Sequence, residues 1–335
     1  MELSRLASLY TQEETSFATV YLEGRSPGED AADQVRLRWH DLRERLTNEG
    51  AEETALSSVE AALSQDKAGE EQADGRVLVA SGGGRLALDQ PWDASLGTGD
   101  QAHWSPLPEL GSYVRHSAGA VRVLLAVADQ QEARLTTLTV ATDVGSTEDS
   151  GPPQEGGSAP HRRVRHRSVK VVDQDAKDFG TTVTEALDGC SPDLVVVAGE
   201  VQGRAALRSR LPEPLPALLV ETDRRGATDS RARQALDEEL LQLATRHIEQ
   251  QQQDGASRFH EAQGHRNTVE NSDQVLEAAE SGALDTLFME VGTAAEKEAR
   301  LIGAAARSGA GFALVPHGTG LTGGAAGILR FSPDG

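Results

Sequence analysis

The chain has 335 residues, of which 38% are apolar and only 4% aromatic, so any core must consist mainly of Leu, Val and Ala. Its formal net charge of −21 at pH 7 is opposite in sign to that of most nucleic-acid-binding domains. The single cysteine, Cys190, excludes an intrachain disulfide and a cysteine-based metal cage. No apolar run approaches the roughly 20 residues of a membrane span. The first residues lack the basic and apolar regions of a signal peptide, and we therefore expect a cytoplasmic protein.

Residues 1–115 have the pattern of a mixed α/β domain. Short apolar runs predict strands at 17–22 and 76–80, and apolar residues at helical spacing predict helices between 31 and 63. The glycines of Ser81–Gly84 follow a strand and could in principle cradle a phosphate. Their spacing matches neither a P-loop nor a dinucleotide fingerprint. We therefore expect a β-turn into a strand at 85–88.

Residues 116–255 alternate between strands and helices. Continuous apolar runs predict buried strands at 121–128 and 193–198, and the first is expected to form a hairpin with 133–140. A short helix at 201–211 and a strand at 217–221 follow. Because strand, helix and strand alternate, we predict a largely parallel sheet. A long helix should then run from Ser230 to about Gln252.

A long polar segment interrupts this central domain. Residues 143–160 contain few apolar side chains, and loops of this length are usually functional or disordered. A basic run, 161–170, follows directly. From Val169 to Leu187 the apolar residues lie on one helical stripe, so we expect the basic run to lead into a helix.

Residues 256–335 predict a third domain after a polar link at 254–266. The expected order is a helix ending at Gly282, a strand at 284–291, a helix at 294–307 and strands near 311–315 and 324–331. This order predicts a small α/β/α sandwich. The fold class is thus α/β, with three mixed domains.

Three segments in this order resemble a known family. The stretch 191–201, SPDLVVVAGEV, is similar to the strand that follows the long helix of its central domain; 273–287, DQVLEAAESGALDTL, resembles the entry to its third domain, and GGAAGILRF its closing strand. The family is the bacterial branch of the archaeo-eukaryotic class I release factor superfamily, of the actinobacterial type. Its wider relatives include Pelota and the hibernation factor Balon. The resemblance covers about 121–335, while residues 1–115 are similar to the N-terminal unit of the bacterial branch.

The resemblance implies a role for the polar segment. Release factors carry a Gly-Gly-Gln at the tip of the central domain, where it enters the peptidyl-transferase centre. Here Gly156, Gly157 and Ser158 take that place, within a tip loop at 143–162. The glycines retain free backbone dihedrals, but the serine lacks the amide of glutamine. Gln154 could be a displaced substitute, although loss of hydrolysis is the better inference.

The basic run is the densest positive charge of this acidic chain. On a helix start its cations would oppose the macrodipole, so stability does not explain them. Arginine forks bind phosphate oxygens, and counterion release adds affinity. The alternative is a solvated helix end offset by neighbouring acids. We expect rRNA or tRNA contact through the tip and this run, that is through Gly156, Gly157, Ser158, His161, Arg162, Arg163, Arg165, His166, Arg167 and Lys170.

Other kinds of site are weaker. The glycine-rich stretch 315–325 resembles the pyrophosphate loop of flavin-dependent oxidases of the vanillyl-alcohol-oxidase type. That loop should lie near the start of a flavin domain, whereas here only ten residues follow it. The pairs His161/His166 and His260/His265 lack carboxylates at ligand spacing. We expect no cofactor, no metal and no catalytic residue.

Two function classes remain. The first is a non-enzymatic factor that fills the vacant A site of an idle ribosome during stress, covering rRNA at the peptidyl-transferase centre. The resemblance also implies elongation factor Tu, or another translational GTPase, as a partner of the third domain. The second is a peptidyl-tRNA hydrolase or ribosome-rescue enzyme that uses the altered tip. Ser158 in the place of glutamine favours the first.

Overall fold

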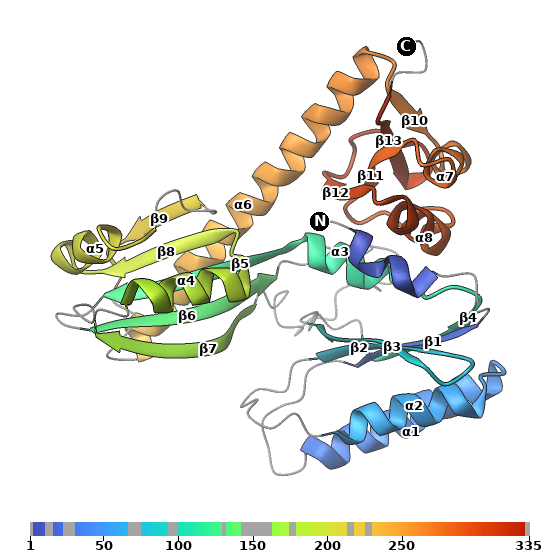
Figure 1. Ribbon diagram of the computed structural model, residues 1–335, viewed down its shortest axis with the longest axis horizontal. Coiled ribbons are helices and arrows are strands. Elements are labelled where there is room, and N and C mark those ends of the chain that lie inside the picture. The colour runs from blue at the N-terminus through green and yellow to red at the C-terminus, as the bar shows by residue number, and fades with distance from the viewer. Residues whose placement is uncertain are drawn as a thin grey trace, which may run out of the picture. The chain divides into compact units, whose positions relative to one another are not determined.

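The structure is a computed structural model, and its described residues form two compact units (Figure 1). Residues up to Ala118 and from Gln251 onward form unit 1, and those between Gly119 and Gln250 form unit 2. No helix in the described part of the chain is long and apolar enough to cross a membrane. The described residues are 3–10, 16–22, 31–65, 75–92, 99–128, 132–141, 163–173, 179–212, 218–224 and 230–331.

The N-terminal part of unit 1 is an antiparallel sheet with strand order β3-β2-β1-β4. Helices α1 and α2 cover one face, where Trp39 and Leu42 pack with Leu56 and Val59 against Val20 of β1. The six residues of β1 are all buried, because both faces of the sheet are covered. The elements are η1 (Leu3–Tyr10), β1 (Phe17–Leu22), α1 (Ala31–Asn48), α2 (Glu53–Ser64), β2 (Gly75–Ser81), β3 (Leu86–Trp92), β4 (Gln101–Ser105) and α3 (Gly111–Ala118).

The glycine run after β2 is a turn, as predicted. The amide of Ser81 donates to the carbonyl of Arg85 (2.9 Å), and that of Gly84 donates to the carbonyl of Ser81 (2.9 Å). Hydroxyl groups from the first turns of α2 hold the turn: Thr54 donates to the carbonyl of Gly82 and Ser58 to that of Gly84. Gly84 has a φ of +87°, which explains a glycine here.

The C-terminal part of unit 1 is an α/β/α sandwich, which confirms the prediction for this segment. Its sheet has the order β10-β13-β11-β12, with β11 and β12 parallel. Helices α7 and α8 pack on one face, and Ala256 and Phe259 of α6 pack on the other against Phe288 and Val315. The elements are α6 (Ser230–Gly264), β10 (Thr268–Glu270), α7 (Ser272–Glu280), β11 (Leu284–Glu290), α8 (Glu298–Ser308), β12 (Gly311–Val315), η3 (Thr322–Gly324) and β13 (Ala325–Leu329).

One hydrophobic cluster joins the two ends of the chain within unit 1. Leu3, Leu6 and Tyr10 of η1 belong to the same buried cluster as Leu301 of α8. Gly303 allows this approach, because a Cβ there would lie 2.6 Å from a ring atom of Tyr10. Segments predicted as separate domains, 1–115 and 256–335, thus share a core. The division into three domains remains a prediction.

Unit 2 is a five-stranded sheet with the order β7-β6-β5-β8-β9. The hairpin of β5 with β6 is confirmed, and β5, β8 and β9 are parallel as expected. The pairs β5-β6 and β6-β7 are antiparallel, so the sheet is mixed, with two parallel and two antiparallel pairings. The elements, besides the first part of α6, are β5 (Ala120–Ala128), β6 (Glu132–Ala141), β7 (Arg163–Asp173), α4 (Phe179–Cys190), β8 (Leu194–Gly199), α5 (Val201–Arg208) and β9 (Leu218–Thr222).

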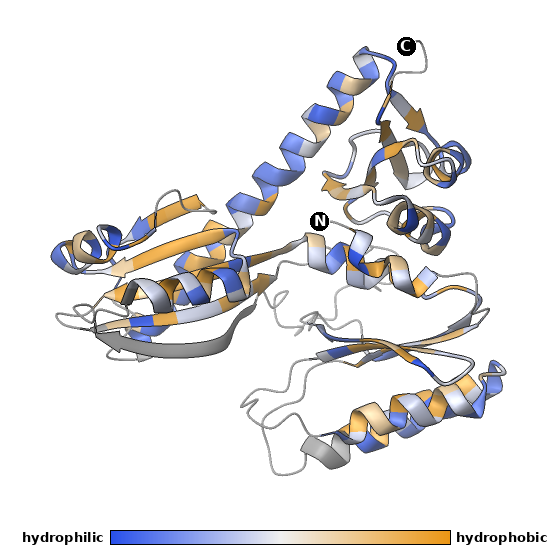
Figure 2. Ribbon diagram, in the orientation of Figure 1, coloured by the Kyte–Doolittle hydropathy of each residue, from blue (hydrophilic) through white to orange (hydrophobic). Residues whose placement is uncertain are grey.

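Helices cover both faces of this sheet. Leu236, Leu240, Ala244 and Ile248, at helical spacing on α6, pack on one face, and α4 and α5 pack on the other. The central strand β8 is buried at all six positions. Figure 2 shows β8 and β9 in hydrophobic colours, whereas much of α6 is hydrophilic.

Two predicted helix boundaries are wrong. The helix from Ser230 does not end near Gln252 but continues to Gly264, so the expected polar link at 254–266 is mostly helical. In this segment the polar residues are interrupted by the buried Ala256 and Phe259, which pack the last turns of α6 against the sheet. The second error concerns the basic run and bears directly on the site.

Candidate functional site

The structure describes only part of the predicted RNA-contacting set. Gly156, Gly157, Ser158, His161 and Arg162 lie outside the described residues. The other members lie together on strand β7, and they are Arg163, Arg165, His166, Arg167 and Lys170.

The basic run forms a strand, not the start of a helix. From Arg163 it pairs with β6 in antiparallel fashion, and α4 begins only at Phe179. The helical stripe predicted from Val169 to Leu187 is confirmed only in its second part, where Val183 and Leu187 of α4 are buried. Its first part is wrong because β-branched valines and alternating residues, RVRHRSVKVV, favour extended backbone at 163–172. The argument that these cations oppose a helix dipole therefore no longer applies.

Strand β7 forms one edge of the unit 2 sheet. Arg163 pairs with Ala141, Arg165 with Thr139 and Lys170 with Leu135. The register shifts between Thr137 and Leu138, whose partners are Ser168 and His166, so Arg167 falls at a bulge. Extended chain rises about 3.3 Å per residue, so residues 163–170 extend along this edge.

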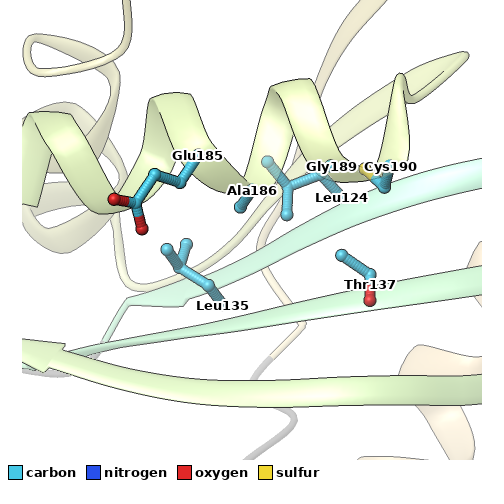
Figure 3. A pocket seen from close by; sticks show the side chains of 7 residues that line it. All are labelled: Leu124, Leu135, Thr137, Glu185, Ala186, Gly189 and Cys190. Carbon is cyan, nitrogen blue, oxygen red and sulfur yellow. The ribbon is translucent and has the colours of Figure 1, made fainter.

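Beside this edge, a pocket of about 250 Å³ lies between α4 and the strands β5 and β6 (Figure 3). Two of its residues, Leu135 and Thr137, come from β6, the direct neighbour of β7. The pocket is mostly apolar, with one carboxylate at its rim. Its lining comprises Leu124, Leu135, Thr137, Glu185, Ala186, Gly189 and Cys190.

Cys190 is a poor nucleophile in this setting. Burial raises the pKa of its thiol, the nearby guanidinium of Arg122 opposes this, and Asp193 adds to it. A thiol with a raised pKa is mostly protonated at neutral pH, whereas the thiolate is the reactive form. The pocket therefore supplies space and apolar surface, but no activated sulfur.

The glycine-rich loop at 315–325 already binds a carboxylate from its own chain. Oε1 of Glu290, whose side chain is 8% exposed, accepts hydrogen bonds from the amides of Gly320 (2.8 Å) and Leu321 (3.0 Å). Two amides that a pyrophosphate would need are thus occupied. The loop connects β12 to β13, and the flavin alternative loses the donors on which it depended.

The histidines named as possible ligands are dispersed. His166 lies on β7, whereas His260 and His265, both exposed, lie on and just after α6. Among the residues that the structure describes, no three His, Cys, Asp or Glu side chains gather within reach of one metal ion.

The sequence reasoning missed a buried ion pair in unit 1. The guanidinium of Arg115 on α3 donates to both carboxylate oxygens of Glu298 (2.8 and 2.9 Å) and to the carbonyl of Glu290 (2.6 Å). Arg115 and Glu298 are separated by 183 positions, and no local pattern connects them. Their role is structural, since the ion pair joins α3 to the start of α8 and the bond to Glu290 joins α3 to the end of β11.

Comparison with known proteins connects unit 2 to a family. Residues 122–265 match the family model described as bacterial archaeo-eukaryotic release factor family 2. Two uncharacterized proteins of Mycobacterium tuberculosis, MT2704 from strain CDC 1551 and Rv2629 from strain H37Rv, are each 25% identical over 238 residues. The alignments cover 68% of this chain and 60% of each relative. The chain thus matches about three fifths of the relatives' length.

Solved structures show a weaker likeness. A model of ribosome-bound archaeal Pelota and ABCE1 is similar with a TM-score of 0.42 and 12% identity, covering 98% of this chain and 94% of that one. Archaeoglobus fulgidus Pelota is similar with a TM-score of 0.31 and 15% identity, covering 78% and 80%. Both scores lie below 0.5, so they do not by themselves establish a shared fold.

Proposed function

We propose that the chain is a member of the bacterial archaeo-eukaryotic release factor superfamily, whose family 2 model matches residues 122–265, and that it occupies the A site of idle ribosomes without releasing peptide. The observation that supports this proposal is the extent of the family match. Residues 122–265 include the expected tip loop and the whole of β7. In this proposal the protein acts in the cytoplasm as a hibernation or stress factor.

Electrostatics supports β7 as the RNA-contacting element. At physiological salt the Debye length is about 8 Å, so acids farther away are largely screened from this strand. Within the run 161–170, Arg and Lys contribute five charges, and Asp and Glu contribute none. A local patch of this kind can bind phosphate although the chain as a whole is acidic. The alternative is that the charges prevent association between sheet edges.

Cosedimentation with vacant 70S ribosomes across a salt series tests this assignment. We compare the wild type with Arg163/Arg165/Arg167→Gln, and expect weaker binding with a salt slope lower by roughly one for each phosphate that the variant no longer neutralises. The matched control is Arg231/Arg233/Arg246→Gln, which removes three exposed arginines of α6 in the same unit. It should bind like the wild type.

Either of two outcomes would contradict the assignment. Equal losses of affinity in both triple variants would mean that ribosome binding depends on the net charge of the protein and not on a site at β7. Absence of wild-type binding at low salt would remove the ribosome as a direct partner of this chain.

The tip supplies a second test of the same proposal. With Ser158 in the place of the family's glutamine, purified protein should release no peptide from ribosomes that carry peptidyl-tRNA. The variant Ser158→Gln restores the family's Gly-Gly-Gln and should gain release activity if the tip reaches the peptidyl-transferase centre. Release by the wild type would favour the hydrolase alternative.

A translational GTPase, elongation factor Tu in particular, is the partner that the resemblance implies for residues 256–335. Its capture by the full chain on ribosomes would support this part of the proposal. Ribosome binding that is complete without any GTPase would show that the partner is not required.

A further inference from the structure

Ser272, the first residue of α7, has a buried hydroxyl group that lacks a partner. The residue is 4% exposed, and its Oγ has no hydrogen-bond partner within the described part of the chain. Most buried polar groups in proteins are hydrogen-bonded, and an exception calls for a cause such as an absent ligand. Ser281, at the other end of α7, is satisfied, because its Oγ donates to the carbonyl of Ala278 (3.1 Å).

The hydroxyl group faces the glycine loop. A Cβ on Gly323 would lie 3.9 Å from Oγ of Ser272, and Gly323 has a φ of +67°. Both Thr322 and Gly323 are exposed, so this side of the loop can be reached from solvent. The hydroxyl group therefore lies between the start of α7 and the loop, within unit 1.

The positive end of helix α7 lies at the same place. The first amides of a helix have no partner inside it. In α7, which has nine residues, the side chain of Asn271 accepts only from the amide of Gln274 (3.1 Å). The amides of Ser272 and Asp273 thus remain as donors at the helix start, where the dipole favours an anion.

Neighbouring charged side chains affect how strongly an anion can bind at this place. Lys297 forms an ion pair with Asp273, which neutralises the nearest carboxylate. Glu296 is exposed nearby and opposes an anion, whereas the carboxylate of Glu290 is engaged by the loop amides. Because these charges nearly cancel, an anion would bind here weakly, through directed hydrogen bonds and not through long-range attraction.

We propose that the start of α7 and the loop at 322–324 bind a phosphate group, with Oγ of Ser272 and the amides of Ser272 and Asp273 as donors. The phosphate is either a backbone phosphate of RNA or a free phosphate. This site lies outside the family-matched segment and does not rest on the proposed function.

The test titrates the full chain with inorganic phosphate and, separately, with a short single-stranded RNA, using calorimetry. Both are repeated for Ser272→Ala and for the matched control Ser281→Ala. To remove RNA binding at β7, the RNA arm uses the Arg163/Arg165/Arg167→Gln background. We expect Ser272→Ala to weaken binding about tenfold, since a hydrogen bond to a charged group is removed, and Ser281→Ala to leave it unchanged.

Thermal unfolding gives an independent readout. Because Oγ of Ser272 has no internal partner, Ser272→Ala should not lower Tm in phosphate-free buffer, whereas Ser281→Ala should lower it slightly. Binding of RNA alone, weakened by Ser272→Ala, identifies the backbone of RNA as the source; binding of inorganic phosphate identifies free phosphate. Binding of neither probe, equal binding by both serine variants, or a fall in Tm for Ser272→Ala would overturn the proposal.

Discussion

The two units differ in how their cores are assembled along the chain. Unit 2 is built from residues 119–142 and 162–250, and it buries apolar residues on both faces of a single sheet. Unit 1 draws on both ends of the chain, and its core includes a guanidinium and a carboxylate that meet across 183 residues. Local hydrophobic periodicity can therefore predict the buried strands of unit 2, whereas the joining of the two segments of unit 1 depends on contacts that no local pattern contains.

The comparison predicts that unit 1 is the more sensitive to single polar substitutions. Arg115→Ala leaves the carboxylate of Glu298, whose side chain is 17% exposed, without its partner. Removing one member of a buried pair typically costs about 3–5 kcal/mol. Urea unfolding followed by tryptophan fluorescence measures this effect in unit 1, because all three tryptophans, Trp39, Trp92 and Trp104, lie there.

A matched change in unit 2 serves as the control. Arg122 pairs with Asp193 through a guanidinium that is 47% exposed, so Arg122→Ala should cost only about 0–1 kcal/mol. Replacing both members of the buried pair, in Arg115→Met/Glu298→Leu, should recover much of the stability that Arg115→Ala removes from unit 1. Because unit 2 contains no tryptophan, far-UV circular dichroism follows its unfolding. Equal effects of Arg115→Ala and Arg122→Ala on the free energy of unfolding would break the comparison.

The contact of η1 with α8 predicts a smaller effect whose sign depends on a second residue. In Gly303→Ala the new methyl group would meet the ring of Tyr10 at 2.6 Å. Overpacking costs about 1–3 kcal/mol, which outweighs the gain of about 1 kcal/mol from alanine in a helix. We expect a net destabilisation of about 1 kcal/mol, measured by the same fluorescence transition.

Removing the ring reverses that expectation. In a Tyr10→Ala background the methyl group meets no ring, and Gly303→Ala should then stabilise unit 1 by about 1 kcal/mol through helix propensity alone. A stabilisation by Gly303→Ala in both backgrounds would show that η1 does not pack on α8 in solution, and an equal destabilisation in both would show that the cost does not come from the ring of Tyr10.

The sequence predicts the parts of the fold that have a clear period. The runs at 121–128 and 193–198 become β5 and β8, and the glycine turn at 82–84 forms as expected. The strand β7 was missed because valines at 169 and 172 also fit a helical stripe, and only alternation at 163–166 separates the two readings. The ion pair of Arg115 and the hydroxyl of Ser272 could not be predicted, since each depends on segments brought together by the fold.

For the candidate RNA-contacting site, the sequence predicts which residues take part but not the element on which they lie. The basic residues at 161–170 stand out in an acidic chain, but their placement on an edge strand follows from pairing with β6. The register that puts Arg165 opposite Thr139 is set by a bulge at 137–138, and a bulge has no reliable local signature.

The smallest predicted effect concerns Glu109 of unit 1, whose carboxyl group interacts with Glu298, the partner of Arg115. Burial raises the pKa of its carboxyl group, with attraction from His103 opposing and repulsion from Glu298 adding. A carboxyl whose pKa is raised in the folded state favours folding when protonated, and this contribution is lost as the pH rises through the folded pKa. Glu109→Gln should therefore stabilise unit 1 at pH 7, by less than about 1 kcal/mol because the group is partly solvated.

The same substitution should have no stabilising effect near pH 4, where the native carboxyl is already largely protonated. Urea midpoints from tryptophan fluorescence at pH 7 and pH 4 measure the difference. The exposed Glu277→Gln in unit 1 is the control and should stay within about 0.5 kcal/mol at both pH values. If Glu109→Gln instead lowers stability at pH 7, the ionised carboxylate is a favourable member of the polar cluster. The higher sensitivity of unit 1 would then come from the removal of attraction, not from the cost of burying charge.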